Sequence, residues 1–263
     1  MRLLGRAGLG ADVTSGGELF LAQRAGIAPE KIIFSGVGKL RHEIEAALEA
    51  DIRALHVESE MELHTIAAIA QERRQVARIG VRVNPNISAE THPYISTGQH
   101  AHKFGVPWPT AHAMLRFAAS HAWLEPVGLA AHIGSQIVDA APFVEAATYV
   151  ADLAAELQAE GIDLHYLDVG GGLGIDYGEG GETISIAEWI TAVTTPITQA
   201  GFPAVYEPGR SIVGPAGALL TRVVYTKQQG EKQFAIVDAG MNDLLRPTLY
   251  GAHHPHRHGD ANR

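Results

Sequence analysis

Three short segments combine the residue types that can hold a flat, phosphate-bearing ligand. The first is His132-Ile133-Gly134-Ser135-Gln136, which follows the apolar run VGLAA. An imidazole at the end of a strand can stack on a planar ring, and the Ser135 hydroxyl can donate a hydrogen bond to a phosphate. Taken alone, the segment is also compatible with a histidine that has only a structural role.

The second segment is Asp168-Val169-Gly170-Gly171-Gly172-Leu173-Gly174. Consecutive glycines after a strand leave backbone N–H groups open to an anion. The segment lacks the G-x-G-x-x-G spacing of a dinucleotide-binding turn. Glu207, which ends the next predicted strand, precedes Pro-Gly-Arg, and this indicates a role other than ribose binding. We favour a phosphate-binding loop; the alternative is a tight turn without a ligand.

The third segment is Glu207-Pro208-Gly209-Arg210-Ser211. A carboxylate paired with a pyridine nitrogen would keep that ring protonated and make it a better electron sink. Arg210 can bind a carboxylate or a phosphate through two hydrogen bonds. The alternative is an exposed Glu–Arg pair, which contributes little. Together the three segments provide a ring to stack on, a phosphate cradle and a ring-nitrogen partner, as pyridoxal 5'-phosphate requires. The predicted cofactor-binding residues are His132, Ser135, Gly170, Gly171, Gly172, Glu207, Gly209 and Arg210.

Strands and helices alternate along most of the chain, which predicts a parallel sheet with right-handed crossovers. The predicted strands span residues 10–13, 32–35, 54–57, 79–84, 127–133, 165–169 and 204–207, and the helical patterns between them include 114–122, 143–161 and 186–200. Gly26, Gly161 and Gly201 stand where helices should end. An open doubly wound sheet also fits, but we predict a (β/α)8 TIM-type barrel that lacks its first strand. All three segments then lie at the carboxyl ends of strands, where such barrels carry their sites.

After residue 215 the pattern changes to β-type. Residues 217–227 and 233–238 are rich in β-formers, and the polar turn QQGEK between them predicts a hairpin. We therefore predict a barrel domain over residues 1–215 and the beginning of a β-rich domain over residues 216–263. We expect both domains to be incomplete.

The composition excludes several classes of function. The formal net charge of −9 argues against nucleic acid as a partner, and the absence of cysteine excludes disulfides and thiolate sites. Without a long apolar run or a signal peptide, a cytoplasmic location is expected and a membrane location is not. We predict no metal site. His253, His254, His256 and His258 are interpreted as tail residues, and His92, His100 and His102 as loop residues.

The motifs resemble the alanine-racemase-type (fold-type III) pyridoxal-phosphate-dependent decarboxylases, and among them the diaminopimelate decarboxylases. The similarity extends over nearly the whole chain. It is carried by GADVTSGGEL, FSGVGK, RVNPN, ISTGQHAHKFG, HIGSQ, DVGGGLG, EPGRS and RPTLYGAHHP. The resemblance implies decarboxylation of meso-2,6-diaminopimelate to L-lysine, a homodimer, a stacking role for His132 and a ring-nitrogen partner in Glu207. It also implies that Arg210, Arg246 and Tyr250 hold the substrate's carboxylates.

The resemblance also implies residues that this chain does not carry. The family anchors its cofactor on a Schiff-base lysine upstream of the GADV segment and uses a catalytic cysteine in its second domain. Lys31, Lys39 and Lys103 lie in other segments, so none takes the anchoring role. We therefore expect a sequence truncated at both ends, with no catalytic residue of its own, that is poorly soluble and inactive as written.

Three alternatives remain open. An ornithine- or arginine-type decarboxylase would share the cofactor cradle, but its substrate lacks the second carboxylate that Arg246 would bind. A non-catalytic pyridoxal-phosphate-binding fragment would keep the cradle without the reaction. A phosphosugar barrel enzyme would share the glycine-rich loop but would not need Glu207.

Overall fold

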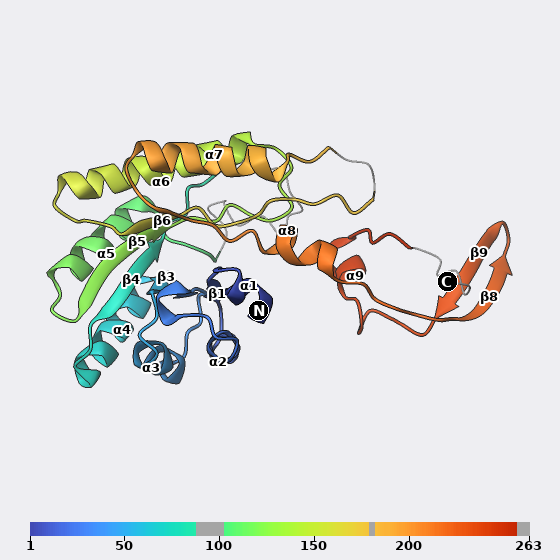
Figure 1. Cartoon of the computed structure of the whole chain (residues 1–263), viewed down its shortest axis with the longest axis horizontal. Helices are drawn as coiled ribbons and strands as arrows, with labels where there is room; N and C mark the ends of the chain where they lie inside the picture. Colours follow the sequence, from blue (N-terminus) through green and yellow to red (C-terminus); the bar gives the residue numbers. More distant parts are fainter. Residues whose placement is uncertain (88–102, 179–181, 257–263) are drawn as a thin grey trace.

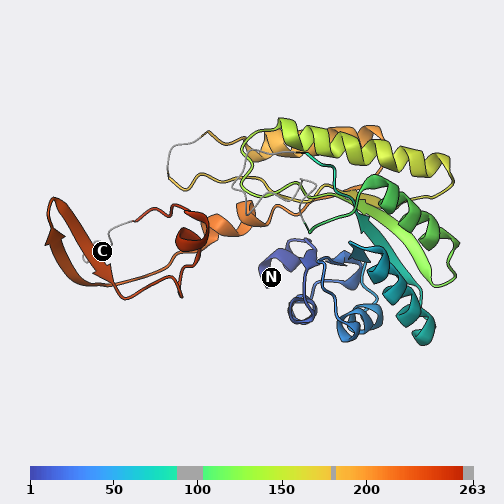
Figure 2. The same ribbon diagram turned by 180° about the vertical axis from the view of Figure 1, so that it is seen from behind.

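The computed structural model describes residues 1–87, 103–178 and 182–256. Seven parallel strands form one sheet in sequential order from β1 to β7, and the sheet curls with helices on its outer side (Figures 1 and 2). Within the described residues β1 and β7 are the two edges and do not pair with each other. The predicted α/β barrel with seven parallel strands is confirmed.

The strands are β1 (Ala11–Val13), β2 (Ile32–Phe34), β3 (Ala54–Val57), β4 (Ala77–Arg82), β5 (Leu124–Ala130), β6 (Tyr166–Asp168), β7 (Ala204–Val205), β8 (Val223–Gln229) and β9 (Lys232–Val237). The helices are α1 (Arg2–Arg6), α2 (Gly16–Arg24), α3 (Arg41–Glu49), α4 (Glu60–Arg73), α5 (Trp108–Ser120), α6 (Ala141–Ala159), α7 (Ile186–Gln199), α8 (Gly209–Val213) and α9 (Arg246–Tyr250). Two short 3-10 turns, η1 (Pro29–Lys31) and η2 (Gly214–Ala216), complete the described elements.

Local sequence explains most element boundaries. Every residue of β2, β3 and β6 is buried, as expected for strands that are covered on both faces. Serine side chains cap the amino ends of α2, α4 and α7, each accepting a hydrogen bond from the backbone N–H three residues on. Gly26, Gly161 and Gly201 have positive φ and follow α2, α6 and α7, so the predicted helix ends are confirmed.

Some predicted boundaries were wrong. β5 begins at Leu124 and α5 at Trp108, several residues before the apolar patterns that predicted them. β7 covers only Ala204–Val205, so Glu207 lies just beyond the strand and does not end it. The short helices α1, α8 and α9 were not predicted, because five residues give no helical periodicity.

Two strand glycines make room for large polar side chains inside the curled sheet. A Cβ on Gly80 in β4 would overlap the His56 ring, and a Cβ on Gly128 in β5 would overlap the Tyr166 ring. His56 Nε2 and the Tyr166 hydroxyl lie 2.8 Å apart and share a hydrogen bond. A polar pair therefore fills the interior just below the carboxyl ends of the strands.

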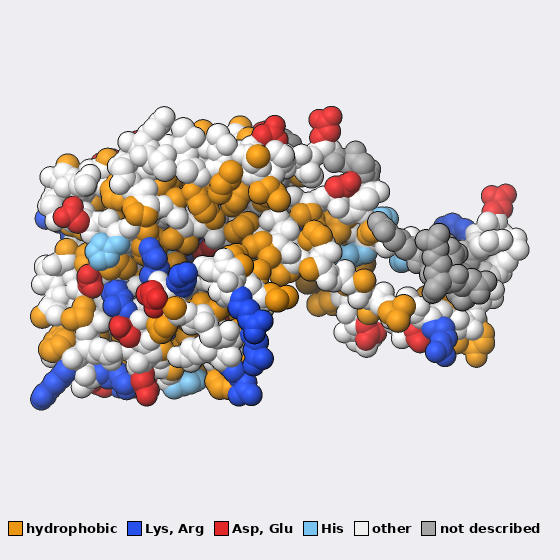
Figure 3. Space-filling view, viewed as in Figure 1, with side chains coloured by type: hydrophobic (Ala, Val, Ile, Leu, Met, Phe, Trp, Pro, Cys, Tyr) orange, Lys and Arg blue, Asp and Glu red, His pale blue; other side chains and the backbone are white. Residues whose placement is uncertain are grey.

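The β8–β9 hairpin is antiparallel, as predicted, and stands apart from the curled sheet in both views (Figures 1 and 2). All residues of both strands are exposed, including Val223, Tyr225 and Phe234. Apolar side chains also gather across the middle of the face seen in Figure 3. None of the helices in the described ranges has both the length and the apolar character needed to cross a bilayer. The division into domains at residues 215 and 216 stays a prediction.

Candidate cofactor site at the carboxyl ends of the strands

The three predicted segments meet, because they follow neighbouring strands. His132 follows β5, the triple glycine follows β6 and Glu207 follows β7. The N–H of Gly171 donates to His132 Nδ1 at 3.1 Å, and the N–H of Glu207 donates to the carbonyl of Gly170 at 2.8 Å. Backbone contacts therefore hold the candidate stacking ring and the candidate ring-nitrogen partner on either side of the glycine loop.

The glycines are required by this close packing. A Cβ on Gly171 would overlap the carbonyl oxygen of Glu207, and one on Gly172, whose φ is 106°, would overlap the carbonyl of Gly134. The amide of Gly170 donates to Asp168 Oδ1, so it is already used. Within the described chain the amide of Gly172 donates to no acceptor. The predicted anion-binding loop therefore offers one open amide, and the tight-turn interpretation explains the other two glycines.

Ser135 and Arg210 also come together. Arg210 donates from Nε and Nη2 to Ser135 Oγ at 3.1 and 2.7 Å, and from Nη1 to the Tyr177 hydroxyl at 2.8 Å. The half-buried guanidinium thus contacts two hydroxyl groups, and the suggested surface pair with Glu207 does not form. The N–H of Gly209 donates to the carbonyl of Glu207 at 2.7 Å, which occupies the amide that was predicted to bind phosphate.

A second arginine extends this cluster toward α9. Arg246 Nη1 lies 3.0 Å from His254 Nε2, and its guanidinium carbon lies 5.0 Å from the centroid of the Tyr177 ring. Tyr177 and His254 pack edge to face at 5.2 Å. Tyr177 therefore joins Arg210 to Arg246, and Tyr250 lies at the end of the same short helix, α9. In the described part of the chain neither arginine forms an ion pair with a carboxylate.

Acidic groups converge just after β6 and β7. One side-chain ligand atom of His56, one of Asp168 and one of Glu207 lie within 4.8 Å of one another. Burial, followed by the nearby Asp168 carboxylate, raises the pKa of Glu207 well above its ordinary value. Two causes raise the pKa of Asp168: its burial and, to a smaller extent, the nearby Asp12 carboxylate. Burial lowers the pKa of His132 to about 4, so its ring is neutral at pH 7.

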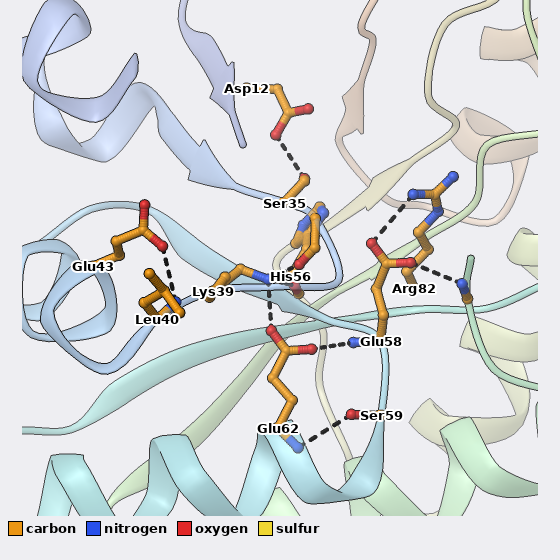
Figure 4. A network of polar contacts seen from close by, with 12 residues as sticks. Asp12, Ser35, Lys39, Leu40, Glu43, His56, Glu58, Ser59, Glu62 and Arg82 are labelled. Carbon is orange, nitrogen blue, oxygen red and sulfur yellow. Dashed lines mark hydrogen bonds and ion pairs between the residues drawn. The ribbon is translucent and has the colours of Figure 1, made fainter. Parts of the chain in front are cut away.

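Charged groups from β4, from α4 and from the loops after β2 and β3 pair with one another, as Figure 4 shows. Lys39 Nζ donates to the carbonyls of Gly36 and His56 and to Glu62 Oε1 at 2.7 Å. These three acceptors use all three of its N–H bonds. That Lys39 does not anchor the cofactor stays a prediction.

Two further contacts line the same mouth. The Arg82 guanidinium lies 3.3 Å from Glu58 Oε1, and Ser35 Oγ donates to Asp12 Oδ1 at 2.6 Å (Figure 4). Asp12 has protein on most sides but stays open to solvent in the concave mouth. Burial, then Glu207, raises its pKa, and solvent screening weakens that effect.

Several residues of this site were missed from the sequence. Asp168 stands in the glycine motif, but its side chain was given no role, and no sequence signal marks Tyr177. His254 had been interpreted as part of a tail, yet it packs against Tyr177. An acidic residue at the end of a buried strand is an available signal for Asp168. Residues 95–102 of the ISTGQHAHKFG motif, the loop histidines His92, His100 and His102, and His258 lie outside the described residues.

The donor set suits a ligand with a flat ring, a basic ring nitrogen and a phosphate. Among the described residues no donor reaches the buried Asp168 Oδ2, and Glu207 beside it can accept or hold a proton. The open Gly172 amide, Ser135 and Arg210 are donors for an anion. A cavity of about 610 Å³ lies in a groove between α6 and α7, and it contains none of these residues.

Comparisons with known proteins agree with this fit. A family model described as "Pyridoxal-dependent decarboxylase, pyridoxal binding domain" matches residues 1–214. The diaminopimelate decarboxylase of Helicobacter pylori (strain J99) is 50% identical over 254 residues, covering 97% of this chain and 62% of the relative. That of Aquifex aeolicus is 44% identical, covering 97% and 60%. The crystal structure of the H. pylori diaminopimelate decarboxylase complexed with L-lysine superposes with a TM-score of 0.93 at 50% identity, covering 97% of this chain and 64% of that chain.

The chain thus spans 62% of the length of the H. pylori relative and 60% of that of the A. aeolicus relative. The family match covers most of the chain, and it includes the strands and all three loops that meet at the site. The chain belongs to the pyridoxal-dependent decarboxylases, in the pyridoxal binding domain of that family.

Proposed function

We propose that the chain is the cofactor-binding part of a diaminopimelate decarboxylase, which converts meso-2,6-diaminopimelate to L-lysine with pyridoxal 5'-phosphate. The observation that carries the proposal is the set of direct contacts that link His132, the glycine loop and Glu207. The 50% identity to a diaminopimelate decarboxylase over nearly the whole chain supports the choice of substrate.

Each part of the cofactor has residues that suit it. The neutral His132 ring would stack on the pyridine ring, and Glu207 would pair with the ring nitrogen. Ser135, Arg210 and the Gly172 amide would bind the phosphate, with Gly170, Gly171 and Gly209 shaping the surrounding backbone. When bound, the cofactor supplies an electron sink for the charge that develops as carbon dioxide leaves.

The substrate's carboxylates would be held by the arginine cluster. Arg210 and Arg246 contact Tyr177 and His254 and have no carboxylate partner in the described residues, so they are available to an anionic substrate. Tyr250 lies one helical turn from Arg246 in α9. Ornithine has a single carboxylate and would use this cluster less fully than diaminopimelate.

The wider setting is proposed on the same basis. We place the enzyme in the cytoplasm as a homodimer, with no membrane or nucleic-acid partner, and with a barrel domain over residues 1–215 and a β domain from residue 216. The exposed β8–β9 hairpin supports a β domain in which further structure covers it, since a two-stranded sheet alone is marginally stable.

The test is binding of pyridoxal 5'-phosphate to the 263-residue chain, measured by equilibrium dialysis. We expect reversible binding that His132→Ala weakens by about tenfold, the effect of losing about 1.4 kcal/mol. The matched control is His165→Ala, whose ring is exposed at the opposite end of β6. Diaminopimelate should perturb the spectrum of the bound cofactor more strongly than ornithine does. Lysine formation by this chain alone is expected to be absent. Failure of the chain to bind the cofactor, or equal loss with the control, would contradict the proposal.

A further inference from the structure

Two carboxyl groups meet at the corner between β6 and β7, and no cation of the described chain is paired to either. Asp168 is 1% exposed, and its Oδ1 accepts the N–H of Gly170 at 2.8 Å. Its Oδ2 is buried and, among the described residues, accepts no hydrogen bond from an N–H or hydroxyl group. The near neighbour of this carboxyl is Glu207: one carboxyl oxygen of each residue and a ring nitrogen of His56 all lie within 4.8 Å of one another. Two ionised carboxylates are both acceptors and repel each other, so a hydrogen bond between them requires a proton on one of them.

The surrounding charged groups are already engaged. Glu58, just after β3, pairs with Arg82 at the end of β4. The charge of this guanidinium is therefore divided between Glu58 and the acidic corner. From β1, Asp12 accepts a hydrogen bond from Ser35 and brings a third carboxyl group near the corner.

Two more titratable groups face the pair. His56 from β3 is hydrogen-bonded to Tyr166 from β6, and burial lowers the pKa of His56 to about 3, so the imidazole is neutral. Lys39 is bound to Glu62 and to two carbonyls, one of which belongs to His56. Among the described residues, Arg82 is a cation that acts on the pair, but it is already paired with Glu58, so two ionised carboxylates would lack a full counter-charge.

We propose that Asp168 and Glu207 share a single proton, and that Asp168 is a positioning residue that holds Glu207 and its proton toward the cofactor's ring nitrogen. The second half of this statement rests on the proposed function, whereas the shared proton does not. Burial and mutual repulsion raise the pKa of both carboxyls, as expected for such a pair. When a ring nitrogen approaches, the proton can stay on the pair or move to nitrogen and leave two carboxylates beside a cation, so no other reactant is needed.

The first test uses the cofactor-free chain. Carboxyl carbons labelled with carbon-13 are titrated by NMR in the wild type, in Asp168→Asn and in the control Asp12→Asn. The wild type should retain about one proton on the pair above the ordinary carboxyl range. The amide that Asp168→Asn introduces can donate to Glu207, so the Glu207 titration should move down by more than about one pH unit. Asp12→Asn should leave the shared proton in place. Ordinary titration of both wild-type carboxyls, or no change in Asp168→Asn, would overturn the proposal.

The second test adds nitrogen-15 pyridoxal 5'-phosphate and follows the ring-nitrogen chemical shift. In the wild type the shift should report a protonated nitrogen, and in Asp168→Asn the protonated fraction should fall. An equal shift in both would defeat the positioning role. If the wild type does not bind the cofactor, the proposed function fails and the first test alone decides the shared proton. If Asp168→Asn does not fold by circular dichroism, Glu207→Gln replaces it, and the Asp168 titration should then fall.

Discussion

Two polar regions line the mouth of the curled sheet, and they are neutralised in different ways. Across β2 to β4, opposite charges face each other, with Lys39 against Glu62 and Arg82 against Glu58. At the corner of β6 and β7, Asp168 faces another acid, and only a proton can satisfy both. The first region is complete without a ligand. In the second region the two negative charges are reduced only while the pair holds a proton, and such perturbed acids are typical of ligand-binding sites.

Breaking the first region should have the largest effect on stability. Lys39→Met leaves Glu62 buried without its partner, because the two side chains are only 1% and 10% exposed. We expect the free energy of unfolding to fall by about 3–5 kcal/mol, measured by urea denaturation. Arg41→Met, which removes exposed pairs with Glu45 and Glu72, is the matched control and should change stability much less. Equal losses in the two variants would show that the Lys39 network is not a buried structural unit.

Separating the two loops of the second region should lower stability less, but it should clearly weaken cofactor binding. In Gly171→Ala the added methyl group collides with the Glu207 carbonyl, so the loop after β6 must separate from the loop after β7. We expect a loss of about 1–3 kcal/mol in the free energy of unfolding, together with weaker cofactor binding. Gly217→Ala adds a methyl group where nothing lies within 4 Å, and it should have neither effect. Unchanged cofactor binding in Gly171→Ala would contradict the placement of the site.

The two regions should also differ in how acid changes the free energy of unfolding, and this effect is smaller than the two above. His56 has a pKa of about 3 in the folded chain and 6.5 as its reference value, so the unfolded chain binds the proton first. Stability should therefore fall as pH drops from 6.5 toward 3, by at most about 1.4 kcal/mol per pH unit for this proton. His56→Gln should remove this contribution, measured as the urea midpoint at several pH values.

The acidic pair acts in the opposite direction. Because the pKa of Asp168 and that of Glu207 are raised in the folded chain, their contribution grows as pH falls toward the ordinary carboxyl range. In Asp168→Asn the loss of stability on acidification should therefore be steeper than in the wild type.

If His56→Gln had the same pH profile of stability as the wild type, the conclusion that His56 is neutral in the folded chain would be wrong.

The sequence was sufficient for the sheet and for the three loops. Runs such as Ala54–Val57 are apolar for most of their length, and glycines such as Gly161 end helices, so local signals predicted the strands and their approximate bounds. The loops then had to meet, because the carboxyl ends of parallel strands share one edge of a sheet.

Local sequence signals could not predict which polar side chains pair with each other. Lys39 and Glu62 look like ordinary surface residues in the sequence, yet they are buried against each other. The link from Arg210 through Tyr177 to Arg246 depends on how α8 and α9 fold back, and such short helices have no periodic signal. Side-chain pairing is a property of the packed chain, whereas the positions of strands follow from local patterns.

The glycines of β4 and β5 have a consequence for how this interior can change. Gly80 accommodates His56 and Gly128 accommodates Tyr166, so each pair of positions shares one fixed volume. A larger residue at either glycine is tolerated only if its partner shrinks, as in Gly80→Ala with His56→Ala or Gly128→Ala with Tyr166→Leu. Residues 56 and 80, and residues 128 and 166, should therefore covary in size, and substitutions there should be rescued in pairs but not singly.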